Sequence, residues 1–357
     1  MPIPFILAGA AALAGVTGLY KGGKAVVNNN KAKEMVADAQ SLYESAKENL
    51  DYQRNITSKD LDTLGRTKLD SWSNDIGTFV KTFKEFKNVE LQGNVNLNEK
   101  LKMKVDSTGN FKNMEIASLK ATEVVKAGVS TLGAGALAGI ASYGGAMMFA
   151  SASTGTAIAT LSGAAATNAT LAWFGGGSLA AGGLGMAGGT AVLGGIVAGP
   201  ILAVAGFIMA AKSEENLSNA KKTYSEAKLA AEKMDTMTDF MSKVSDISNN
   251  YNSFISEFTQ RYKTVLNNLN QIYSITKEEQ KGLFINKLRS IFGLGYKVDF
   301  RKLSLDQQKY LQFSWLMTQV LYAVLTAPIL TQDGDLDKDV FNTLEGAKES
   351  SQKLIGA

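Results

Sequence analysis

Hydrophobic residues recur every three or four positions along two long stretches of the chain. In residues 25–88, and again in residues 213–277, these positions form a single stripe, and Lys, Glu, Asp, Asn and Ser fill the places between them. This period is typical of an amphipathic helix that buries one face and exposes the other to water. We therefore predict two long helices that need partners for their apolar faces, and we interpret them as an antiparallel pair.

The period changes from about 3.6 to 2 after the first stretch. Apolar residues fall on odd positions only: Val89, Leu91, Val95, Leu97, Leu101, Met103 and Val105. Alternation of this kind, with a turn near Asn98–Lys100, predicts a β-hairpin over residues 89–105, and a third short strand near Phe111 completes a unit of residues 89–112. Lys100, Lys102 and Lys104 share the polar face, where they either guard a strand edge or meet lipid headgroups.

The central feature is a stretch without charge. Between Lys126 and Lys212 lie 85 consecutive residues that include no Asp, Glu, Lys or Arg, and 20 of the 35 glycines fall there. A helix that is apolar all round is surrounded by lipid or by protein, because it has no face to offer to water. Several parts of this stretch are long enough to span a bilayer. We predict that residues 113–212 form a membrane-insertion region.

Small residues within the charge-free stretch repeat at a spacing of four, which stacks them on one helix face and lets two helix backbones approach closely. These membrane-packing candidates are Gly135, Gly139, Gly185, Gly189, Gly195, Gly199 and Ala203. Lysines border the apolar stretches where membrane-flanking cations are expected. These flanking candidates are Lys21, Lys24, Lys126 and Lys212.

The two ends of the chain differ in character. Residues 1–24 begin with an uncharged run and have basic residues only after it, which favours a membrane contact over a signal peptide; the run could span a bilayer, lie at its surface or pack in a core. In residues 278–357 we predict shorter helices at 283–292 and 304–330, followed by a polar tail. The uncharged run Tyr310–Gln332 contains several Gln, Ser and Thr residues, which favours a buried bundle helix over a further span.

The composition excludes every functional site that depends on cysteine or histidine. The chain has no cysteine and no histidine, so disulfides, thiolate nucleophiles, imidazole bases and the metal sites that depend on them are absent. Its net charge of +4 is too small for its length to mark a nucleic-acid binder. We nominate no catalytic residue, no cofactor and no metal, and we predict that the protein is not an enzyme.

Three motif-like spacings support no site. The Gly18–Lys24 run has phosphate-loop spacing, but Ala25 stands where a magnesium-binding Ser or Thr belongs. Gly183, Gly185 and Gly188 lack the acidic residue that a dinucleotide site needs further along. The alternating aspartates between Asp333 and Asp339 lack the glycine and glutamate of a calcium loop.

The predicted fold is mainly α: a long amphipathic helical hairpin that carries a charge-free, Gly/Ala-rich helical membrane segment, with a small β-hairpin. Over residues 25–272, this layout resembles the α-helical pore-forming toxins of the cytolysin A and haemolysin BL type. That resemblance implies an insert that is hidden in a soluble form and exposed on membranes. Residues 165–189, with their run NATLAWFGGGSLA, also resemble glycine-zipper stretches of uncharacterised bacterial proteins.

Two functions compete at this point. The first is membrane permeabilisation by a bacterial toxin or effector whose soluble form converts to a membrane-bound one. The second is a constitutive inner-membrane protein with a cytoplasmic helical scaffold, because Lys120 and Lys126 before the charge-free stretch and Lys212 after it place both ends on one side. Both predict a lipid bilayer as partner, a homo-oligomer or a helical partner protein, and no nucleic acid.

Overall fold

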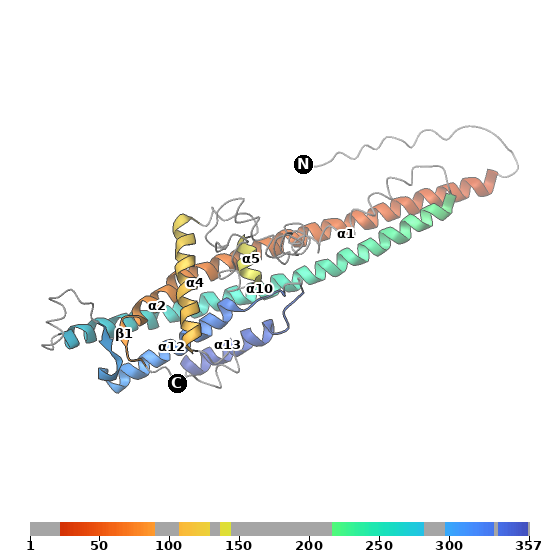
Figure 1. Ribbon diagram of the computed structural model, residues 1–357. Helices are drawn as coiled ribbons and strands as arrows, with labels where there is room; N and C mark the ends of the chain where they lie inside the picture. The colour runs from red at the N-terminus through yellow and green to blue at the C-terminus, as the bar shows by residue number, and fades with distance from the viewer. Residues whose placement is uncertain are drawn as a thin grey trace. The chain divides into compact units, whose positions relative to one another are not determined.

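A computed structural model describes residues 22–89, 107–128, 136–143, 216–281, 297–331 and 335–355 (Figure 1). The protein is mainly helical, as predicted, and its described part holds one two-stranded sheet. Most of the predicted membrane-insertion region, the helix expected at residues 283–292 and the apolar run of residues 1–20 lie outside the described residues.

The chain divides into two compact units. Unit 1 comprises residues 1–49 and 199–235, and unit 2 comprises residues 50–198 and 236–357. In unit 1, small side chains dominate the described buried positions: Ala39, Tyr43, Ala46, Ala220, Thr223, Ala227, Ala230, Ala231 and Met234. Alanine buries little apolar area, so this unit gains little hydrophobic stabilisation per residue.

The first long helix consists of three consecutive segments. These are α1 (Gly22–Asp70), the π-helical turn η1 (Ser71–Ile76) and α2 (Gly77–Phe83). The helix ends at Phe83 instead of residue 88, because Phe86–Lys87 form strand β1 and Asn88 adopts a left-handed backbone with φ of 57°. The second long helix, α10, runs over Asn216–Lys281, close to the predicted residues 213–277.

The two long helices run parallel in unit 2, so the predicted antiparallel hairpin is wrong. Three hydrogen-bonded pairs show the direction, since both residue numbers rise together: Thr57 with Met241, Thr67 with Asn252, and Tyr273 with Glu85. In an antiparallel pair one number would fall as the other rises. An amphipathic stripe determines which face is buried but not the direction of the partner, and the long connection from α2 to α10 leaves ample chain for a return.

Two helices of this connection pack in unit 2. Helix α4 (Ser107–Ala127) packs against η1 and α2, so the third strand expected near Phe111 is wrong. The Phe111 ring contacts the rings of Phe83 and Trp315, with centroids 5.2 and 6.4 Å apart. Helix α5 (Ala136–Tyr143) follows and lies inside the charge-free stretch. The β-hairpin predicted over residues 89–105 falls outside the described residues except for Val89.

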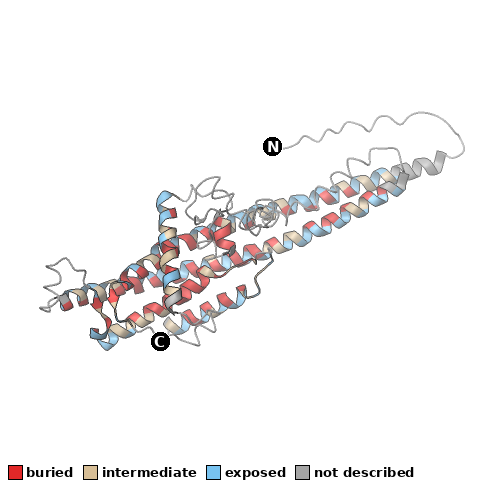
Figure 2. Cartoon of the chain, in the orientation of Figure 1, coloured by how far each residue is buried: buried red, intermediate tan, exposed pale blue. Residues whose placement is uncertain are grey.

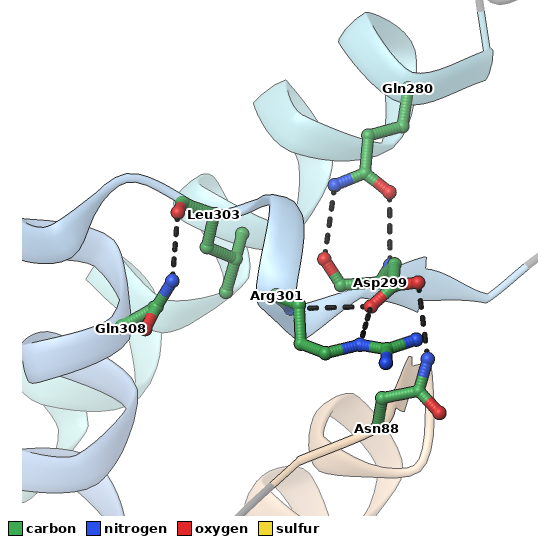
Figure 3. Close-up of polar contacts among 6 residues, drawn as sticks. All are labelled: Asn88, Gln280, Asp299, Arg301, Leu303 and Gln308. Carbon is green, nitrogen blue, oxygen red and sulfur yellow. Dashed lines mark hydrogen bonds and ion pairs between the residues drawn. The ribbon is translucent and has the colours of Figure 1, made fainter.

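The sheet was not predicted. Strand β1 (Phe86–Lys87) pairs in parallel with β2 (Val298–Asp299). Gln280, near the end of α10, fixes β2 by accepting from the Asp299 backbone N–H at 2.9 Å and donating to its carbonyl oxygen at 3.3 Å (Figure 3). The Asp299 carboxylate accepts from the Asn88 side chain and from Arg301, which ties both strands to the 3-10 turn η5 (Phe300–Lys302).

Two helices close the chain. Helix α12 (Leu305–Thr326) begins with a capping box formed by Ser304 and Gln307. It ends before the predicted residue 330, because Pro328 disfavours helical backbone at Ala327, which is extended. Helix α13 (Val340–Ile355) packs on α12 and buries Val340, Leu344 and Ala347, so the predicted polar tail is wrong.

The core of unit 2 lies between α1–η1–α2, α4, α5, α10, α12 and α13, where the buried residues gather (Figure 2). Helix α12 is buried over most of its C-terminal half, and Trp315, Val320, Leu321 and Val324 have no solvent exposure. None of the helices in the described ranges is both long enough and apolar enough to cross a bilayer.

Candidate functional site

The structure describes one helix of the charge-free stretch, and its environment is the candidate site. Five residues of α5 are buried, and Ala138 between them is half-buried. The buried residues are Leu137, Gly139, Ile140, Ala141 and Ser142. No residue of α5 carries a charge, and Leu137, Ile140 and Ala141 belong to the hydrophobic core. We call Gly65, Lys68 and the strap of residues 327–331 the α5 contact site.

Gly65 brings the backbones of α1 and α5 together. A Cβ atom built on Gly65 would lie 2.1 Å from the Leu137 carbonyl oxygen and 2.7 Å from its carbonyl carbon. These are backbone atoms, which cannot turn aside as a flexible side chain could. Glycine is therefore required at this position for α5 to lie where it does.

Lys68, one helical turn after Gly65, holds the other end of α5. Its side chain is completely buried, and its Nζ donates to the carbonyl oxygens of Ala141 at 3.2 Å and Ala327 at 3.0 Å. Ala141 lies in the last turn of α5 and Ala327 is the C-cap of α12. Carbonyls at helix C-termini lack intrahelical donors and carry partial negative charge, so a lysine between two such ends satisfies both.

The surroundings of Lys68 are otherwise apolar. Its Nζ lies 5.5 Å from the ring centroid of Tyr251 on α10, a cation–π geometry. The Tyr251 hydroxyl donates to the Val340 carbonyl oxygen at 2.7 Å. Burial and, to a smaller extent, the charge of Asp337 raise the pKa of this hydroxyl. No carboxylate of the described ranges pairs with Lys68, and burial lowers its pKa from 10.5 to about 7.

The strap continues the contact at the end of α5. The backbone N–H groups of Ile329 and Leu330 both donate to the Ser142 carbonyl oxygen, at 2.6 and 3.0 Å. Leu330 also forms an antiparallel bridge with Leu336, and the Asp337 N–H donates to Ile329 at 2.8 Å. The strap therefore connects α5 to the segment that leads into α13.

A second group of buried polar side chains lies around η1. Asp75 is 3% exposed, and burial raises the pKa of its carboxyl group to about 6, against the opposing effects of Lys263 and a hydrogen bond with Ser71. Nearby, the hydroxyls of Tyr262 and Thr318 are hydrogen-bonded at 2.5 Å. On α12, Trp315 Nε1 and Gln319 Oε1 are buried without a hydrogen-bond partner, which is costly in a protein interior.

The structure places three of the predicted site residues. Gly139 is buried in α5, Lys126 is exposed in the last turn of α4, and Lys24 belongs to α1. The other predicted residues lie outside the described ranges: Gly135, Gly185, Gly189, Gly195, Gly199, Ala203, Lys21 and Lys212. Gly139 thus belongs to the helix that the α5 contact site holds, whereas Lys126 belongs to α4.

Sequence reasoning missed Gly65 and Lys68, although one signal was present. Leu64, Lys68, Trp72 and Ile76 follow one another at a spacing of four, so a lysine occupies the apolar stripe of the first helix. A charged residue at a buried position usually has a specific partner. The partners here are carbonyl groups, which no sequence pattern reveals.

The arrangement holds α5 through hydrogen bonds to its last turn and a close backbone approach at Leu137. Across the described ranges, no three acidic residues gather into a metal-binding group. The aspartates from Asp335 to Asp339 serve the start of α13 instead, since Asp337 accepts from the Asp339 N–H at 2.8 Å. In comparisons with known proteins, the chain matches no protein-family model, no curated protein and no solved structure.

Proposed function

We propose that the protein inserts its charge-free segment into a lipid bilayer and thereby permeabilises or disrupts the membrane. The observation that carries the proposal is the position of α5. This helix belongs to a segment that no ionised side chain interrupts, and it lies buried in the helical core of unit 2, where its apolar side chains pack and its last carbonyls accept hydrogen bonds.

The composition of the segment suits a change of environment. Leu, Ile, Phe and Val each favour insertion by roughly 0.3–0.6 kcal/mol at mid-helix, whereas the Gly and Ala that dominate here add little. A modest preference for lipid can be offset by burial inside a protein. A preference this modest can be offset, for α5, by burial such as that at the α5 contact site.

The core that holds α5 also contains costly groups. Lys68 and Asp75 are buried ionisable groups, and Trp315 and Gln319 on α12 each bury an unsatisfied polar atom. Each reduces the stability of the closed bundle relative to a state in which water reaches these groups. Such costs favour a protein that can open over one that is permanently closed.

A liposome leakage assay with the purified full-length protein tests the proposal. Dye-filled vesicles of neutral and of anionic lipid should release dye when the protein is added, over pH 5–9. The segment's small residues also predict packing between inserted copies, so leakage should rise more steeply than linearly with protein concentration. Vesicles that stay intact under all these conditions would refute the proposal.

The alternative, a constitutive inner-membrane protein, depends on the lysines that border the charge-free stretch. Fractionation of expressing cells distinguishes the two. Protein that resists carbonate extraction from the time of synthesis supports a resident membrane protein. A soluble pool that becomes membrane-bound when liposomes are added supports conversion.

A further inference from the structure

The strap of residues 327–331 connects two helices that are distant in sequence. On one side it donates two backbone N–H groups to Ser142 at the end of α5. On the other it pairs with Leu336 and Asp337, directly before α13. The position of α5 is therefore coupled to the position of α13 through backbone hydrogen bonds.

Tyr251 joins the same system from α10. Its hydroxyl donates to Val340, the first residue of α13, and its ring lies against Lys68, which donates to Ala141 of α5 and to Ala327 of the strap. One aromatic side chain thus contacts both the helix that holds the strap and the lysine that holds α5.

The hydrogen bonds from Lys68 and from the strap lie at the C-terminal end of α5. Lys68 and the strap engage the carbonyls of Ala141 and Ser142, whereas at Leu137 the contact is the close backbone approach that Gly65 permits. Losing the strap would leave the Ser142 carbonyl without these two donors in a buried site. An unsatisfied buried carbonyl is unfavourable, so α5 would then leave the core more readily.

We propose that the strap, together with Lys68 and Tyr251, is an autoinhibitory latch, and that α13 must move with the strap before α5 and the segment behind it can reach a membrane. This inference rests on the proposed function for its consequence at the bilayer. The coupling between α13 and α5 stands on the hydrogen bonds alone and can be tested without lipid.

A disulfide across the latch gives the decisive experiment. The hydrogen bond from Leu330 to Ser142 limits their Cα atoms to a separation of about 7 Å or less, near the range that a disulfide spans. The double variant Ser142→Cys, Leu330→Cys is compared with each single variant, and Ser142→Cys, Ile329→Cys serves as a second pairing. Because the chain has no cysteine of its own, any bridge seen by mass spectrometry is the engineered one.

In the leakage assay, the oxidised double variant should lose activity, and dithiothreitol should restore it to the level of the single variants. Oxidised, bridged protein that leaks as fast as its reduced form would overturn the latch. If the unmodified protein leaves all vesicles intact, the proposed function fails, and the latch is judged by the next measurement.

Amide hydrogen exchange without lipid tests the coupling itself. The variant Tyr251→Phe removes the hydroxyl bonded to Val340 but keeps the ring over Lys68. Loss of one such hydrogen bond should speed exchange in α13 and in residues 136–143 about fivefold. Tyr273→Phe, which removes a hydroxyl bonded to Glu85, is the matched control and should leave both regions unchanged. Faster exchange in α13 with unchanged exchange in α5 would refute the coupling.

Discussion

The α carbon of Gly65 faces the carbonyl of Leu137 so closely that a methyl group on it would lie 2.1 Å from the carbonyl oxygen. This relationship places the first turn of α5 directly on α1. It also makes α5 sensitive to a single methyl group on its neighbour.

Gly65→Ala should displace α5. Overpacking of this kind costs about 1–3 kcal/mol, which exceeds the roughly 1 kcal/mol that alanine gains over glycine in a helix. Urea unfolding should show a loss of stability, and hydrogen exchange should quicken in residues 136–143. Gly77→Ala is the control, because its new Cβ would lie 3.7 Å from the nearest atom, an ordinary contact, and it should be neutral or stabilising.

Lys68 should make stability depend on pH in alkaline solution. Its pKa is about 7 in the folded protein and 10.5 when exposed, so the unfolded chain binds more protons between these values. Stability should therefore rise with pH from 7 upward, by at most about 1.4 kcal/mol per pH unit, and stay level with respect to this group below pH 7.

Lys68→Met should remove that dependence. Chemical unfolding at pH 7, 8 and 9 measures it, below the range where Tyr251 and Tyr262, whose pKa values burial raises, contribute. Equal slopes in the variant and the unmodified protein would show that Lys68 is not the group responsible.

Asp75→Asn should stabilise the protein above pH 6. Burial raises the pKa of Asp75 from 3.8 to about 6, so the folded state binds the extra proton between these values and bears a buried charge above them. The gain should be on the order of 1–2 kcal/mol at pH 7.5 and should vanish below pH 4. Asp246→Asn, which changes an exposed aspartate of α10, should change the unfolding midpoint little at either pH.

Gln280→Ala should loosen the attachment of β2 to α10. It removes two hydrogen bonds to the backbone of Asp299 and should cost about 1–3 kcal/mol, measured by urea unfolding. Gln308→Ala, which removes one bond to the Leu303 carbonyl, should cost less than half as much. A larger loss from Gln308→Ala would contradict the role assigned to Gln280.

Periodicity predicted the helices but not their direction. The stripe that ends at Phe83 and the stripe around Tyr251 correctly mark buried faces, since burial depends on which side chains share a helix face. Direction depends on pairings such as Thr67 with Asn252, between polar residues that the stripes do not include. Strand β1 was missed for a related reason, because two residues are too few to show a period of two.

Predicting the candidate site required tertiary information. Gly139 belongs to the predicted packing residues, but Gly65 and Lys68, which contact its helix, come from a helix about seventy residues earlier. Lys68 contacts backbone carbonyls. Because every residue has a carbonyl group, the sequence does not reveal which residues are its partners. The polar residues at the end of the chain hid α13 because its buried face consists of few and partly small residues, such as Ala347.

The parallel course of α1 and α10 in unit 2 bears on whether opening can be undone. The bonds that align them, from Thr57, Thr67 and Glu85 to α10, use no residue of the intervening connection. Because these bonds involve no residue of the connection, α1 and α10 can stay aligned when α5 leaves the core. If α5 leaves the core as we propose, the aligned helices would remain as a template to which it can return, and its release would then be reversible.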